Sequence, residues 1–66
     1  MKSLKQARLA AGKTQAQVAE EVGISERNYQ NYERGLVEPG VRTAIRIADA
    51  LGVEVKELFG ESKSNG

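Results

Sequence analysis

The chain has 66 residues, enough for one small domain with one modest core, and it lacks both cysteine and histidine. These absences exclude disulfide bonds, cysteine or histidine metal sites, thiolate nucleophiles and the commonest general base, so we expect no enzyme and no cofactor. The formal net charge is only +1, and neither a membrane span nor a signal peptide is evident, which predicts a soluble, cytoplasmic protein.

The first predicted element is a helix between Ser3, which can cap its start, and Gly12, which ends it. Its apolar residues recur at helical spacing, at Leu4, Ala7 and Ala11. Arg8 lies one turn after Leu4 on the same face, so its guanidinium is directed toward the core and needs a partner. All charges before residue 14 are basic, so this segment either faces an anion or forms an ordinary solvated helix surface.

The segment 14–35, TQAQVAEEVGISERNYQNYERG, predicts two short amphipathic helices joined by a turn at Gly23. Thr14 and Gln17 have the spacing of a capping box, and Ser25 can cap the second helix. The buried stripe of the first of these helices is expected to contain Val18, Ala19 and Val22. Two short helices connected through a glycine-bearing turn predict a helix-turn-helix.

The second helix of this motif has two different faces, with Tyr29 and Tyr32 on the side expected to be buried. The opposite side carries residue types that read base edges, because arginine pairs with guanine, asparagine or glutamine with adenine, and glutamate with cytosine. The candidate base-contacting residues are Glu26, Arg27, Asn28, Gln30 and Asn31. An ordinary polar helix surface is the alternative, but the preceding helix and turn favour DNA.

Glu33 lies within about 40° of Tyr29 on the helical wheel, so its carboxylate faces the core as Arg8 does on the first helix. The two misplaced charges have opposite signs. We therefore expect a buried or half-buried ion pair between Arg8 and Glu33 that is structural and takes no part in recognition.

The remainder of the chain predicts a loop over 36–40, which holds the only proline, and two further helices over 41–51 and 55–59. The stripe of the longer helix is expected to contain Val41, Ala44, Ile47, Ala48 and Leu51. Ile45 lies off that stripe. We expect one all-α domain of five helices over 1–60, followed by a disordered tail over 61–66.

Residues 4–60 resemble the Cro and phage-repressor (XRE-like) class of helix-turn-helix DNA-binding proteins. The resemblance rests on TQAQVAEEVGIS from Thr14, YERG ending at Gly35, Pro39 in the next loop, and IADALGVEVKELF over 47–59. It implies a lambda-repressor-like fold and a transcriptional regulator, of repressor type, that binds double-stranded DNA with its third helix in the major groove.

Carried over to this sequence, the family pattern places Glu26, Arg27 and Asn31 at positions that commonly contact bases. It also implies phosphate contacts around the start of the second helix and the flanking loops, at Thr14, Gln15, Ser25, Arg34 and Arg42. The family often pairs a first-helix arginine with the glutamate before the third-helix glycine, as expected for Arg8 and Glu33. Lys13 departs from the pattern, because relatives usually have an apolar residue there.

Dimerisation is expected because one recognition helix reads few base pairs, and a family member usually binds a palindromic operator as a homodimer. Apolar candidates for the dimer contact are Ile45, Val55 and Phe59. No membrane or small-molecule partner is evident from the sequence. Two alternatives remain at this point: an antitoxin-like or other protein-binding module, and the DNA-binding domain of a larger regulator.

Overall fold

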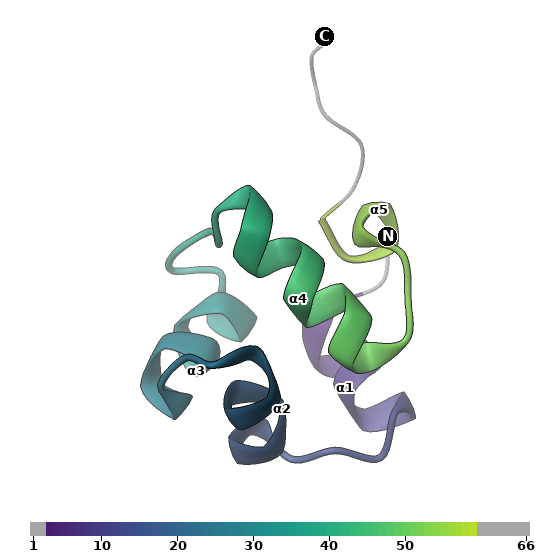
Figure 1. Ribbon diagram of the computed structural model, residues 1–66, viewed down its shortest axis with the longest axis horizontal. Helices are drawn as coiled ribbons and strands as arrows, with labels where there is room; N and C mark the ends of the chain where they lie inside the picture. Colours follow the sequence, from purple (N-terminus) through teal and green to yellow (C-terminus); the bar gives the residue numbers. More distant parts are fainter. Residues whose placement is uncertain (1–2, 60–66) are drawn as a thin grey trace, which may run out of the picture.

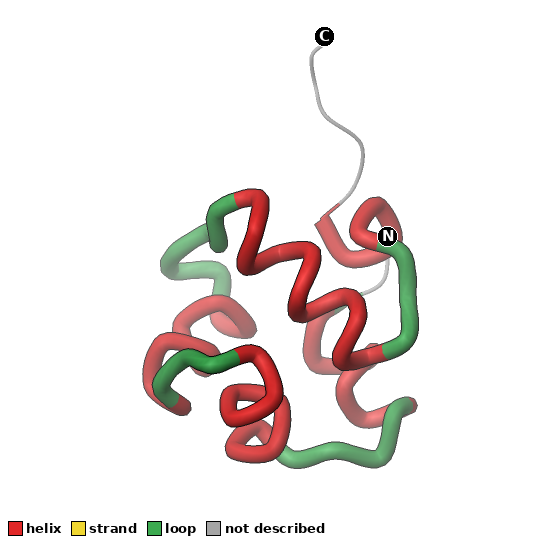
Figure 2. Tube along the Cα trace, in the orientation of Figure 1, coloured by secondary structure: helices red, strands yellow, loops and turns green. Residues whose placement is uncertain are grey.

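The computed structural model describes residues 3–59, which form five helices joined by loops and contain no strand (Figure 1, Figure 2). The helices are α1 (Leu4–Ala10), α2 (Gln15–Val22), α3 (Glu26–Arg34), α4 (Val41–Leu51) and α5 (Val55–Phe59). The predicted all-α, five-helix fold is confirmed. The expected tail over 61–66 and the domain limit at residue 60 lie outside the described residues.

Helix α2 packs against both α3 and α4, while α1 contacts α3 and α5 contacts α4. In Figure 1, α2 and α3 lie side by side below the N-terminal end of α4, and α4 crosses the front of the molecule. Helix α3 contacts α2 and α1, and Glu26, Arg27 and Asn28 on its outward side remain exposed. None of the helices within 3–59 combines the length and apolarity needed to cross a bilayer.

The first three helices begin at a serine or threonine whose hydroxyl oxygen accepts a hydrogen bond from the backbone N–H three residues later. These caps are Ser3, Thr14 and Ser25. The Gln17 side-chain oxygen in turn accepts a 2.8 Å hydrogen bond from the Thr14 N–H, which confirms the predicted capping box. Gln6 and Ser3 form a second capping box at α1, which the same three-residue spacing between a hydroxyl residue and a glutamine could have predicted.

The turn between α2 and α3 depends on Gly23, whose φ of 88° lies in the left-handed region that side chains with a Cβ rarely adopt. Its N–H and the N–H of Ile24 both donate to the Ala19 carbonyl, at 2.8 and 3.0 Å. Ile24 then packs against the core. The predicted helix-turn-helix is therefore present, and this turn fixes how α3 leaves α2.

The core collects the predicted stripes of α1, α2 and α4 around Tyr29, which is fully buried. Ile47 and Val18 are equally inaccessible, and Leu58 of α5 belongs to the same buried cluster. Tyr32 is only partly buried and packs against the same cluster. The face of α3 that carries Tyr29 is thus committed to packing, as the helical wheel predicts.

The prediction that Val41 belongs to the buried stripe of α4 is wrong. The i, i+3, i+4 pattern places it there, but its side chain is 80% exposed. It is the first residue of the helix, and the buried face begins one turn later at Ala44. Periodicity gives the direction of a side chain but not where the covering element ends. Among the described residues, the first turn of α4 therefore leaves an apolar side chain at the surface.

Lys13 stands where an apolar residue is expected, and its ammonium group forms polar contacts with two helices. Its Nζ lies 2.8 Å from Glu21 Oε1 on α2 and donates a 2.7 Å hydrogen bond to the Ala50 carbonyl near the end of α4. The lysine therefore ties the α1–α2 loop to α2 and to α4.

Candidate nucleic-acid interface

The outward face of α3 gathers most of the residues that the sequence predicts to contact bases. An open hollow of about 500 Å³ is lined by Glu26, Arg27, Gln30, Asn31 and Arg34. Gln30 and Asn31 are half-buried at its floor, and the other three side chains are exposed. The hydrogen-bond donors of two arginines and two side-chain amides thus lie beside one carboxylate on the outward face of α3.

Asn28 does not line this hollow, although it is exposed on the same helix. Its backbone N–H donates to the Ser25 hydroxyl oxygen at 3.0 Å, which leaves the Ser25 O–H free to donate outward. Arg42 is exposed in the first turn of α4 and lies in neither hollow of the α3 surface. The structure therefore brings together most, but not all, of the predicted contact residues.

A second hollow of about 530 Å³ adjoins the first, because Gln30 and Arg34 line both. Its other lining residues include Gln15, the first residue of α2, and the exposed Lys5 of α1. Thr14, the α2 cap, is exposed next to Gln15 in the chain. Lys5 was not among the predicted contacts, and the basic charge of the first segment was the only sequence signal for it.

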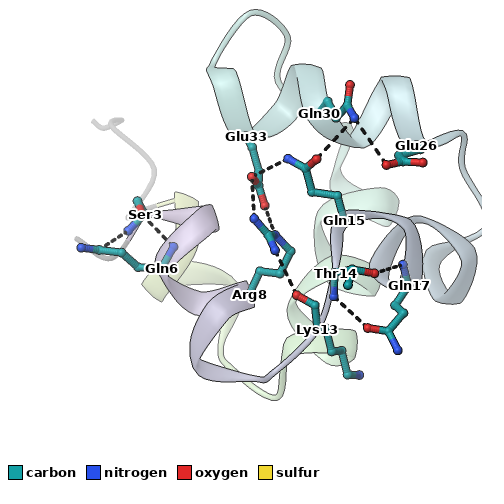
Figure 3. Close-up of polar contacts among 10 residues, drawn as sticks. All are labelled: Ser3, Gln6, Arg8, Lys13, Thr14, Gln15, Gln17, Glu26, Gln30 and Glu33. Atoms are coloured by element: carbon teal, nitrogen blue, oxygen red, sulfur yellow. Dashed lines mark hydrogen bonds and ion pairs between the residues drawn. The ribbon is translucent and has the colours of Figure 1, made fainter.

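The ion pair predicted between Arg8 and Glu33 is present at the base of this second hollow. Arg8 Nε lies 2.6 Å from Glu33 Oε2, and the two side chains are only 10% and 5% exposed. Arg8 Nη1 also donates a 3.0 Å hydrogen bond to the Lys13 carbonyl. The guanidinium therefore joins α1, the α1–α2 loop and the end of α3 (Figure 3).

The glutamines above this ion pair form a network that the sequence does not predict (Figure 3). Gln15 Nε2 donates to Glu33 Oε1 at 3.0 Å, and Gln30 Nε2 lies 3.3 Å from Gln15 Oε1. Gln30 Nε2 also lies 3.5 Å from Glu26 Oε2. The polar contacts thus run continuously from the buried pair to the first turn of α3.

Glu33 has a pKa below its usual value although burial by itself would raise that pKa. The hydrogen bond from Arg8 lowers this pKa most, the neighbouring Tyr29 hydroxyl and the hydrogen bond from Gln15 lower it further, and together they outweigh the loss of solvation. A group whose pKa is lowered by folding adds stability above its unfolded pKa, and this stability is lost as the pH falls through the folded pKa. The ionised carboxylate is therefore the form that the fold requires.

Replacing Glu33 with glutamine is expected to destabilise the domain at neutral pH and to matter progressively less in acid. The difference in free energy of unfolding between wild type and Glu33→Gln should shrink as the pH falls below 4.5 and through the lowered pKa of the folded state. Chemical denaturation across this range measures it, with Glu20→Gln on the exposed side of α2 as the control. A difference that stays constant with pH would show that folding does not lower the pKa of Glu33.

The sequence of this fold matches the helix-turn-helix family model over residues 4–58. The chain is 47% identical to the cryptic phage CTXphi transcriptional repressor RstR of Vibrio cholerae serotype O1, over 80% of this chain and 47% of the repressor. It is 36% identical to the HTH-type transcriptional regulator ImmR of Bacillus subtilis, over 94% of this chain and 49% of that protein.

A third relative, the SPbeta prophage-derived HTH-type regulator YonR of Bacillus subtilis, is 36% identical over 85% of this chain and 52% of its own length. The chain thus spans about half the length of these curated relatives. No solved structure gives a significant match. The family match covers all the helices that position the α3 face, and the chain therefore belongs to the helix-turn-helix family.

Proposed function

We propose that the chain binds double-stranded DNA sequence-specifically and acts as a transcriptional regulator of the repressor type, with α3 in the major groove. The observation that carries this proposal is the hollow on the outward face of α3, where arginine, amide and carboxylate groups converge. A helix with such side chains has the size and the hydrogen-bonding groups that the major groove admits. The relatives that are named as repressors or transcriptional regulators support the same function.

Within this proposal, the α3 residues read bases and the surrounding residues hold the backbone. Arg27 and Asn31 can each make paired contacts, to guanine and to adenine, while Glu26 can accept from cytosine. Asn28 and Gln30 are neighbours on the same helix. Backbone contacts are assigned to residues around the two hollows and the first turn of α4, at Thr14, Gln15, Ser25, Arg34 and Arg42.

Such a regulator would work in the cytoplasm of a prokaryotic cell, at the nucleoid, and by binding without catalysis. Selection of bound sequences from random duplex DNA tests the proposal. We expect an enriched motif with a two-fold repeat whose half-sites lie about one helical turn, roughly 34 Å, apart. Recovery of no enriched sequence after several rounds would overturn the regulator function.

The dimer that such a palindrome requires is proposed to form through an apolar groove of about 550 Å³ between α4 and α5. The three candidate residues Ile45, Val55 and Phe59 all line it. The exposed Val41 stands at its edge, and Ile45 is 47% exposed. In a two-fold contact each groove can receive the aliphatic side chains of the other copy, which removes both apolar surfaces from water.

Replacing Ile45 with aspartate should therefore convert the dimer to a monomer without unfolding it. Burying a carboxylate in an apolar contact is strongly unfavourable, so affinity for a two-half-site duplex should fall by at least about tenfold, while affinity for one half-site stays unchanged. Sedimentation and DNA titration measure these effects. Leu9→Asp is a matched control, because Leu9 is 58% exposed on α1. Retention of the dimer by Ile45→Asp would exclude this groove as the interface.

A further inference from the structure

Hydrogen bonds among side chains of α1, α2 and α3 form a relay that begins at the buried Arg8 and ends at the α3 surface (Figure 3). Its links are Arg8 to Glu33, Gln15 to Glu33, Gln30 to Gln15, and Gln30 to Glu26. Two amide side chains therefore stand between two carboxylates. An amide can be turned either way, so the direction of each depends on its neighbours.

Both ends of this relay impose the same direction. An ionised carboxylate only accepts hydrogen bonds, so Glu33 requires the Nε2 of Gln15, which lies 3.0 Å away, to face it. The Oε1 of Gln15 then faces Gln30 and requires the Nε2 of Gln30, 3.3 Å away. At the other end, the Glu26 carboxylate also requires that Nε2.

Gln30 Nε2 consequently contacts two acceptors, Gln15 Oε1 and Glu26 Oε2, whereas Gln30 Oε1 has no partner within the relay. In Figure 3 the Oε1 of Gln30 points away from both Gln15 and Glu26. Turning the amide over would place Oε1 against the Glu26 carboxylate and against the Gln15 oxygen. Such a rotation would lose two hydrogen bonds and create two repulsive contacts.

We propose that this relay fixes Gln30 as a hydrogen-bond acceptor and so makes it read an exocyclic amino group in the major groove, either adenine N6 or cytosine N4. The inference rests on the proposed function. Guanine and thymine present oxygen acceptors at the corresponding places in the major groove, and a glutamine held in this direction gives them no donor. Gln15 and Glu33 then act as positioning residues for base preference, in contrast to the purely structural role that the sequence predicts for Glu33. The second N–H of Gln15 remains free to contact phosphate.

The first step of the test locates the base that Gln30 contacts. Sequences are selected from random duplex DNA by wild type and by Gln30→Ala, and the contacted position is the one whose preference Gln30→Ala loses. Wild type should enrich adenine or cytosine there. Replacing that base with its analogue lacking the amino group should weaken wild-type binding by about 3- to 10-fold and leave Gln30→Ala unaffected. The purine and pyrimidine analogues separate the two bases.

The second step tests the relay itself. Gln15→Met removes the 3.3 Å contact and leaves only the longer, 3.5 Å contact to Glu26 to hold the Gln30 amide. The Gln30 position should therefore accept guanine or thymine more readily than in wild type, while the other positions keep their preferences. Adding Gln30→Glu to this variant should restore the preference for amino-bearing bases, because a carboxylate only accepts. Arg34→Ala, which removes a neighbouring charge in the same hollow, should weaken all sequences alike without changing any preference.

Several results would overturn the inference while leaving the proposed function intact. One is a wild-type preference for guanine or thymine at the Gln30 position, and another is a Gln15→Met preference identical to wild type. A Gln30→Ala variant that alters no position would also overturn it. Absence of any enriched sequence for wild type would instead remove the proposed function, and this inference with it.

Discussion

Arg8→Met is expected to lower the free energy of unfolding by about 3–5 kcal/mol, because it leaves the nearly inaccessible Glu33 carboxylate without its cation. The loss is large for so small a domain, whose total stability is expected to be on the order of 5–15 kcal/mol or less. It also removes the hydrogen bond to the Lys13 carbonyl. Urea denaturation followed by circular dichroism measures the change.

The double variant Arg8→Met with Glu33→Leu should be more stable than Arg8→Met alone, because it no longer buries an unpaired charge. Arg46→Met on the exposed side of α4 is the matched control and should change stability by no more than about 0.5 kcal/mol. A double-mutant cycle without coupling energy would contradict a structural role for the pair.

Arg27→Ala is expected to weaken binding to the preferred DNA site by about 1–3 kcal/mol and to relax the preference at one base position. The reason is that a guanidinium makes paired contacts to guanine that no other base reproduces. Titration of the preferred duplex and of its single-base variants measures both effects. Arg42→Ala, an exposed arginine assigned to the backbone, should weaken all sequences similarly and reduce the salt dependence by about one phosphate contact.

Arg46→Ala removes the same charge from α4, away from both hollows of the α3 face, and should leave the base preferences unchanged. The assignment of Arg27 to base reading would be wrong if its loss weakened every sequence equally. It would also be wrong if Arg46→Ala relaxed the same base position.

Local signals in the sequence predict much of the fold. The hydroxyl caps and the terminating glycines need only nearby residues, so the starts and ends of α2 and α3 could be placed in advance. The pair between Arg8 and Glu33 could also be predicted, because each charge stands on an otherwise apolar face and the two have opposite signs. A charged residue on the apolar face of each of two helices thus predicted a contact between these helices.

The other polar contacts between distant segments could not be predicted in this way. Gln15 meets Glu33 and Gln30 across 18 and 15 residues, and Lys13 meets the Ala50 carbonyl across 37. Each of these bonds depends on the angle at which two helices pack, which periodicity does not contain. For this reason Gln15 could be predicted only as a phosphate anchor, whereas the structure adds its contacts to the α3 surface.

The proposed function depends most directly on the ratio between affinity for the selected DNA site and affinity for a scrambled duplex of equal length and composition. We expect wild type to bind the selected site at least about 10³-fold more tightly, since specific binding typically exceeds non-specific binding by this much. Raising the salt concentration should weaken both affinities. A ratio of specific to non-specific affinity near one, at low and at raised salt concentration alike, would contradict sequence-specific recognition by α3.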